Sequence, residues 1–189
     1  MPTVRDIITD AFRIGGIIGL GEDPKANEAD FALTGLQSMF HSWVSSGLFG
    51  SMTEVFAADD YTAHENERIT IDSAVVTIPT TFAEDGTDGD DRAPRELSVI
   101  QCVSDTATTT YIYDRREWRA IETLALGDEC PLSGFGARGL ASTLSLELCG
   151  LPAFGSNPTP SMVQAARAFK TAVMRARYGS AEHVGADFF

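Results

Sequence analysis

The chain is short of cysteine, of basic residues and of long apolar runs, and each shortage excludes a class of protein. Its 189 residues include three cysteines, an odd number without C-x-x-C spacing. This fits neither a disulfide scaffold nor a structural zinc site, and it indicates a reducing compartment. Lysine and arginine number 14 against 27 aspartate and glutamate residues, giving a formal charge of −13. That balance argues against general binding to nucleic-acid phosphates or to an anionic membrane.

Long hydrophobic segments are also missing. The longest apolar run, Ile14–Leu20, is interrupted by glycines and is far shorter than the roughly 20 residues that cross a bilayer. Charged residues within the first turns argue against a signal peptide, so we expect no membrane partner. With 43% hydrophobic and 22% charged residues, the composition is that of a folded chain, and its length predicts one domain.

The first 50 residues predict a pair of helices. Thr3 and Asp6 have the spacing of a capping box at the start of the first helix. Asp23 and Pro24 predict the start of a second helix, which continues to Gly47. The apolar residues of the first helix recur at helical spacing: Val4, Ile7, Ile8, Ala11 and Phe12.

One side of the second helix lacks charge. From Phe31 to Thr53 the sequence has no Asp, Glu, Lys or Arg. Because the outer face of a helix normally carries charge, we expect this side to be covered, either by the same chain or by a neighbouring subunit. The candidates for a subunit interface are Thr34, Gln37, Ser38, His41, Ser42 and Ser45.

The middle of the chain predicts an antiparallel β insertion over residues 54–113, because its apolar residues alternate. Two hairpins are expected, within 69–78 and within 97–113, and their strand order stays open. The acidic segment 84–91 lacks the alternating oxygen ligands of an EF-hand loop. We interpret it as a solvated loop rather than a calcium site.

A short helix is predicted over residues 114–124, since Asp114 and Glu117 have capping-box spacing. The same segment carries a cluster of arginines, which forms either a solvated face or a site for a phosphate or an acidic partner. The clustered residues are Arg115, Arg116 and Arg119.

Residues 127–157 are rich in glycine, proline and serine, which predicts long loops with one strand at Thr143–Leu148. Gly134, Gly136 and Gly139 match the spacing of a dinucleotide-binding loop. No strand pattern precedes them and no ribose-binding acid follows, so we do not interpret them as a cofactor site.

The last helix is predicted over residues 159–178, capped by Thr159 and opened by Pro160. It carries four basic residues and no acidic one, and a short tail follows at 180–189 that ends in two phenylalanines. Two exposed aromatic residues on a tail are candidates for docking into a partner. The basic and aromatic candidates are Arg167, Lys170, Arg175, Arg177, Phe188 and Phe189.

No catalytic or metal-binding motif is recognisable. His41, His64 and His183 lack the spacing of a metal or catalytic site, and no G-x-S-x-G is present. We therefore expect a protein that is not an enzyme and uses no cofactor or metal. A small acidic hydrolase that uses a carboxylate pair stays as an alternative.

Five segments of the sequence together match the pattern of apolar and turn residues of one protein family: Val4–Arg13, Gly19–Pro24, Ala32–Leu48, Asp114–Ile121 and Pro160–Gly179. They resemble the head-to-tail adaptor, or connector, proteins of tailed bacteriophages, of the tail-accessory or packaged-DNA-stabilisation type. The similarity is strongest in the first 50 residues and covers the last helix less closely.

The resemblance implies a structural protein of the virion neck, assembled in the cytoplasm of the bacterial host. Such proteins form a ring, usually of twelve copies, beneath the portal protein, and they provide a platform for tail or stopper proteins. Double-stranded DNA passes through the ring without sequence-specific binding, and the C-terminal segment reaches towards the portal. Another neck component, such as a head-completion or tail-terminator ring protein, is the main alternative.

The sequence thus predicts an α+β, mainly α fold. Its core is a helical bundle with two N-terminal helices, a short middle helix and a C-terminal helix, with an inserted antiparallel β region and long loops. The predicted organisation is one domain over residues 1–179, with 1–50 as a helical hairpin, followed by the tail.

Overall fold

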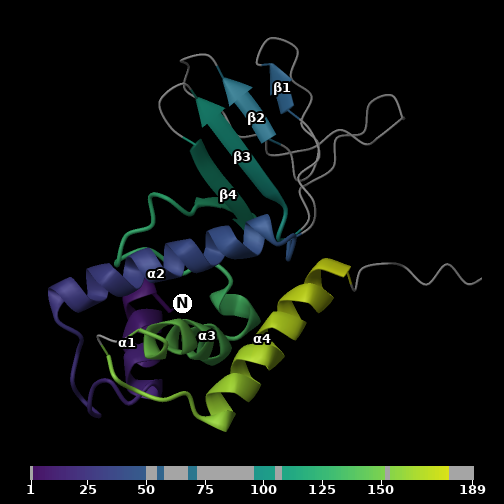
Figure 1. Ribbon diagram of the computed structural model, residues 1–189. Helices are drawn as coiled ribbons and strands as arrows, with labels where there is room; N and C mark the ends of the chain where they lie inside the picture. The colour runs from purple at the N-terminus through teal and green to yellow at the C-terminus, as the bar shows by residue number, and fades with distance from the viewer. Residues whose placement is uncertain are drawn as a thin grey trace, which may run out of the picture.

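The computed structural model describes residues 2–49, 55–57, 68–71, 96–104, 108–151 and 154–178. Helices α1, α3 and α4 lie on one side of α2, and the β-sheet lies on the other (Figure 1). The predicted α+β, mainly α fold is confirmed. The elements are α1 (Val4–Ile14), α2 (Ala26–Ser45), β1 (Val55–Ala57), β2 (Arg68–Ile71), β3 (Val99–Ser104), β4 (Thr108–Asp114), β5 (Glu117–Ala120), the 3-10 turn η2 (Ser133–Phe135), α3 (Ala137–Cys149) and α4 (Pro160–Tyr178).

Helix α1 begins with the predicted capping box. The Asp6 carboxylate accepts the Thr3 N–H at 2.8 Å, and the Thr3 hydroxyl accepts the Asp6 N–H at 3.2 Å. The hydrogen bond that the Thr3 N–H donates to the carboxylate is the largest cause of a lowered pKa of Asp6. The carbonyl of Asp128 accepts the Val4 N–H at 2.8 Å. The capping box and the Asp128 carbonyl thus accept hydrogen bonds from backbone N–H groups that have no partner within the first turn of a helix.

Helix α2 begins at Ala26, so the prediction that Asp23 caps it and Pro24 opens it is wrong. The Asp23 carboxylate instead lies 3.3 Å from the Arg13 guanidinium. The Glu28 carboxylate accepts the Lys25 N–H at 2.9 Å and takes the capping role. An ion pair to α1 therefore holds the expected cap residue outside the helix.

The sheet has the strand order β1-β2-β3-β4-β5. Strands β3 and β4 pair antiparallel, as predicted for the 97–113 hairpin, with Gln101 opposite Thr110. Strand β5 adds a further antiparallel pairing to β4, with Tyr113 opposite Trp118, which the sequence did not predict. Strands β1 and β2 extend the sheet by parallel pairing, which the sequence pattern did not predict. The second half of the 69–78 hairpin and the acidic segment 84–91 lie outside the described residues.

The predicted helix over 114–124 is wrong, because this segment forms the turn and second strand of a hairpin. Arg115 and Arg116 have φ values of 55° and 67°, as a two-residue hairpin turn of type I′ requires. The Asp114 carboxylate is 1% exposed and accepts the Leu132 N–H at 3.0 Å instead of capping a helix. A capping-box spacing therefore coincided here with a β-turn.

The predicted strand at Thr143–Leu148 is also wrong, since these residues belong to α3. Leu140, Leu144 and Leu148 are four residues apart and all are buried. The hydroxyl of Thr143 donates to the Gly139 carbonyl at 2.9 Å, so the helix accommodates its polar residues. Every second residue fits a strand and every fourth fits a helix, and an even leucine spacing satisfies both patterns.

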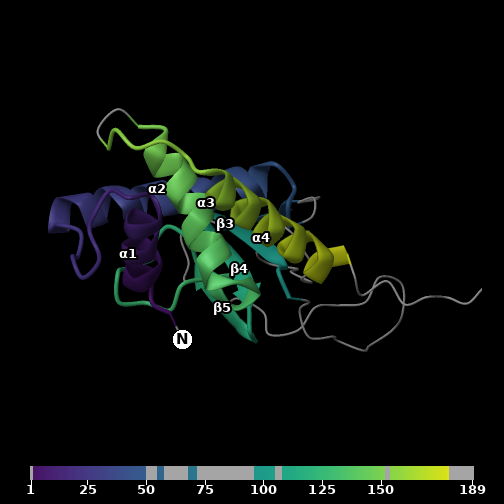
Figure 2. The ribbon, with the colours of Figure 1, turned by 90° about the horizontal axis from the view of Figure 1, so that it is seen from below.

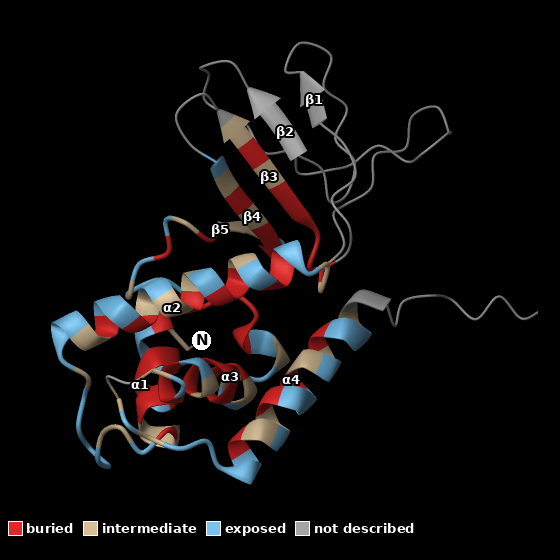
Figure 3. Ribbon diagram, viewed as in Figure 1, coloured by how far each residue is buried: buried red, intermediate tan, exposed pale blue. Residues whose placement is uncertain are grey.

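Helix α4 spans Pro160–Tyr178, close to the predicted bounds. The Thr159 hydroxyl accepts the Met162 N–H at 3.4 Å, as expected of its cap. The apolar residues Met162, Phe169 and Val173 of this helix are buried. Figure 3 shows the buried sides of the helices turned towards one another in a single core.

Helix α3 packs against α1 on one side and α4 on the other (Figure 2). A Cβ placed on Gly139 would lie 2.6 Å from the Phe169 Cβ, and one on Gly15 would lie 2.8 Å from the Ser145 hydroxyl oxygen. Gly139 of the glycine pattern thus permits close helix packing. The pattern begins inside the 3-10 turn η2 rather than directly after a strand, unlike a dinucleotide-binding loop.

We predict that Gly139→Ala destabilises the chain by about 1–3 kcal/mol, because the added methyl group overlaps Phe169. Gly35→Ala in α2 is the matched control, since its Cβ would meet only Leu144 Cδ1 at an ordinary 3.9 Å. The control should be neutral or stabilising by up to about 1 kcal/mol. Urea unfolding measures both. Equal effects of the two substitutions would contradict the close approach of α3 and α4.

Candidate interaction surfaces

The uncharged side of α2 is covered by the chain along one edge. The Gln37 side-chain amide donates to the Glu122 carbonyl at 3.3 Å. His41 Nε2 lies 3.4 Å from Glu122 Oε1, and Glu122 Oε2 accepts the Thr110 N–H at 2.7 Å. Glu122 therefore joins this edge of α2 to strand β4. Two of the six predicted interface residues thus have partners outside α2, whereas the Thr34 hydroxyl donates within the helix to the Asp30 carbonyl at 3.2 Å.

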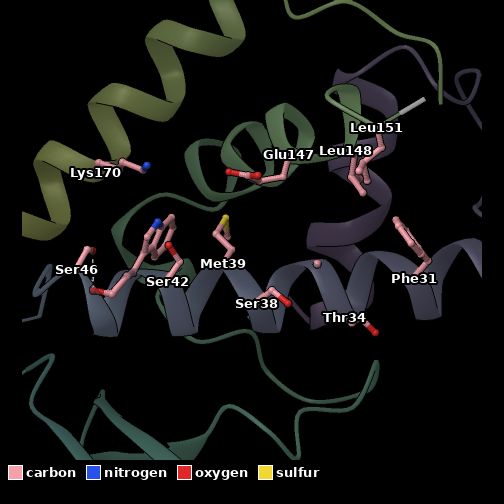
Figure 4. Close-up of a pocket in the computed structure, with 12 residues that line it drawn as sticks. Phe31, Thr34, Ser38, Met39, Ser42, Ser46, Glu147, Leu148, Leu151 and Lys170 are labelled. Carbon is pink, nitrogen blue, oxygen red and sulfur yellow. Dashed lines mark hydrogen bonds between the residues drawn. The ribbon is translucent and has the colours of Figure 1, made fainter. Parts of the chain in front are cut away.

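The other edge of the same side is open. Thr34, Ser38 and Ser42 of α2 and Ser46, the residue that follows this helix, are spaced four residues apart and are exposed. They line a groove of about 600 Å³ between α2, α3 and α4 (Figure 4). Its other lining residues are Phe31, Gly35, Met39, Trp43, Glu147, Leu148, Leu151 and Lys170.

The groove changes character along its length. Lys170 and Ser46 lie at one end, and Phe31, Leu148 and Leu151 lie at the other (Figure 4). The Lys170 ammonium lies 5.6 Å from the centre of the Trp43 ring, in reach of a cation–π contact. This end is therefore basic and aromatic, whereas the opposite end is apolar.

Two charged residues that line the groove are not neutralised there. Neither Glu147 nor Lys170 forms an ion pair with another residue in the part of the chain that the structure describes. A ligand or segment carrying an acidic group is suited to the Lys170 end. The geometry therefore fits recognition of a surface or a peptide.

The basic residues of α4 are divided between the groove and the solvent. Arg167 and Arg175 are exposed, whereas Lys170 is half-buried at the groove. The side chain of Arg177 and the tail residues Phe188 and Phe189 lie outside the description. Of the predicted docking residues, the structure thus presents two arginines for an external partner.

The arginine cluster of the β4–β5 hairpin is engaged largely within the chain. Arg115 donates to the Ser133 hydroxyl at 3.2 Å, while its backbone N–H donates to the Glu96 carboxylate at 3.0 Å. Arg119 donates to the carboxylate of Glu129 at 2.9 Å. These contacts fasten the hairpin to neighbouring loops. Arg116 is exposed.

The three cysteines are free and buried. Burial, with a smaller contribution from the Glu122 charge, raises the pKa of Cys102 to about 11. Burial, together with the nearby Asp114 charge, raises the pKa of Cys130 to about 12. Such thiols are poor nucleophiles, because the reactive form is the thiolate. They contribute to packing.

The described residues contain no group of three or more His, Cys, Asp or Glu side chains placed to hold a metal ion. None of the described helices has the length and apolar character needed to span a membrane. His64 and His183 lie outside the described residues.

No protein-family model matches the sequence, and no curated protein matches it. Function is therefore inferred from the residues and their arrangement.

Sequence reasoning found the α2 side of the groove but missed the side built by α3. Glu147, Leu148 and Leu151 were not singled out, because their segment was predicted as a strand and loops. The four-residue repeat of Leu140, Leu144 and Leu148 is the signal that finds this helix.

We predict that a thiol reagent at pH 8 modifies Cys102 and Cys130 at least about 100-fold more slowly in the native chain than in urea. Their raised pKa values leave almost no thiolate at this pH, and both side chains are buried. Mass spectrometry after digestion assigns the modified residues. Native labelling of either residue as fast as in urea would contradict this environment.

Proposed function

We propose that the chain is a structural protein of the bacteriophage neck, an adaptor that forms a ring beneath the portal and extends the DNA channel. The observation that carries the proposal is the uncharged side of α2, of which Thr34, Ser38 and Ser42 remain exposed in the single chain. The sequence resemblance to head-to-tail adaptors supports the same assignment.

Small uncharged side chains are suited to subunit packing, because removing them from water costs little free energy. In a ring, each copy contacts its two neighbours through two different surfaces. We assign one of these two surfaces to the open edge of α2. Because Gln37 and His41 contact Glu122, the proposed interface consists of the remaining candidates, Thr34, Ser38, Ser42 and Ser45.

The acidic composition suits a channel for DNA. A net charge of −13 repels phosphates, so double-stranded DNA slides past without sequence-specific binding. A basic lining would retain the DNA instead.

The basic side of α4 is the proposed contact with the portal protein. Arg167 and Arg175 are exposed on this helix and free to meet acidic groups. Arg177, Phe188 and Phe189 extend the candidate contact along the chain, and Lys170 contributes from the groove. A tail or stopper protein is the expected partner at the other end of the ring.

We predict that Ser38→Glu prevents ring assembly on the portal while the chain still folds, because a carboxylate would be buried without a partner. Native mass spectrometry of the variant mixed with the portal ring counts the bound copies. Ser38→Ala is the conservative control and should assemble as the wild type does. A complete ring that carries Glu at position 38 would place the interface elsewhere.

We predict that combining Arg167→Glu with Arg175→Glu weakens attachment to the portal by at least about tenfold, since charge reversal removes two attractive contacts. Both residues are exposed, so the melting temperature should not change. Combining Arg116→Glu with Arg138→Glu, two exposed positions outside α4, is the control that changes the net charge by the same amount. Equal loss in the control would indicate a general charge effect. Attachment to the tail tube with none to the portal would favour a tail-terminator role.

A further inference from the structure

The groove between α2, α3 and α4 has a cation at one end and an apolar surface at the other. Lys170 makes no ion pair within the described residues and lies over Trp43. At the far end Phe31 is 48% exposed and lies with Leu148 and Leu151 on the groove. A peptide with an acidic residue followed at a distance by aromatic residues matches this order.

The chain itself carries such a peptide after α4. Helix α4 ends at Tyr178, and the remaining sequence, Gly-Ser-Ala-Glu-His-Val-Gly-Ala-Asp-Phe-Phe, ends at Phe189. Its first residue is glycine, the residue that most readily reverses the chain after a helix. Among these residues Glu182 and Asp187 are acidic, and Phe188 and Phe189 are aromatic.

The spacing of these residues matches the groove if the segment turns back along α4. Lys170 precedes Tyr178 by eight residues, which is about 12 Å of helix at roughly 1.5 Å per residue. An extended chain advances about 3.3 Å per residue, so about four residues cover this distance. The fourth residue after Tyr178 is Glu182.

The second half of the segment matches the second half of the groove. From Trp43, beneath Lys170, to Phe31 is twelve residues of α2, or about 18 Å. Five or six extended residues span about that distance. Counted from Glu182, they end at Asp187 or Phe188, which brings the two phenylalanines to the apolar end.

We propose that Gly179–Phe189 folds back and occupies the groove of its own chain. Glu182 pairs with Lys170, and the aromatic pair covers Phe31, Leu148 and Leu151. Covalent linkage favours this occupant over a second copy, because it gives the segment a high effective concentration at the groove. The inference goes beyond the proposed function, since it concerns the chain before assembly. On assembly the segment would vacate the side of α2 that a neighbouring copy then covers.

Zero-length carbodiimide cross-linking of the full chain tests this, because Lys25 and Lys170 are its only lysines. The expected product is an amide between Lys170 Nζ and the Glu182 carboxyl group within a monomer, identified by mass spectrometry. Combining Phe188→Ala with Phe189→Ala should lower its yield at least about fivefold, since the aromatic anchors supply the apolar contact. Ala181→Ser is the control and should leave the yield unchanged. The yield of cross-links from Lys25 should be the same in the wild type and in both variants.

A mixture of unlabelled and ¹⁵N-labelled chains identifies which copy supplies the segment. Products of a single label are expected, whereas mixed-label products would assign the groove to the tail of a second copy and overturn the proposal. A yield that is insensitive to loss of both phenylalanines would overturn it as well. So would products that link Lys170 to residues 84–91 in place of the tail. None of these outcomes involves the portal, so each leaves the adaptor proposal standing.

Discussion

The close approach of Gly139 to Phe169 is the contact on which the arrangement of the helices depends. It brings α4 against one side of α3, while Gly15 and Ser145 bring α1 against another. With both of these sides of α3 occupied, α4 meets α2 mainly at Trp43, whose ring lies 5.9 Å from that of Phe169. The remaining length of α2 is left facing a groove. A larger residue at position 139 would push α4 outwards and change the width of that groove, so a packing constraint between two helices also shapes the candidate interaction surface.

The helices that the sequence predicts well are those whose ends are marked by local chemistry. Thr3 and Thr159 accept hydrogen bonds from the helix starts that follow them, and these contacts need no information about the rest of the fold. Where tertiary contacts decide, local signals mislead. Asp23 has the character of a cap, but its pairing with Arg13 removes it from α2. Asp114 has the same character, but it is buried against the Leu132 N–H at the end of a strand, and the following turn relies on positive φ values that arginine rarely adopts.

The candidate surface was predictable only in part, because its lack of charge is a local property of the sequence and its coverage depends on tertiary contacts. The absence of charge from Phe31 to Thr53 is visible in the sequence and predicts a side that is covered by the same chain or by a neighbouring subunit. Which edge the chain covers is not visible, because it depends on Glu122 reaching Gln37 and His41 from the sheet side of α2. The α3 wall was missed because alternating leucines fit a strand as well as a helix. The proposed interface is therefore restricted to residues that form no hydrogen bond or ion pair with a described residue outside α2.

We propose that the open edge of α2 is an interface in the assembled protein rather than a surface exposed to solvent. A cryo-electron microscopy reconstruction of the full chain bound to its portal ring tests this most directly, since it shows what lies against Thr34, Ser38 and Ser42. The account predicts a closed ring in which this edge is buried against the adjacent copy, with the exposed arginines of α4 turned towards the portal. A ring in which the same edge faces solvent or the open channel would contradict it.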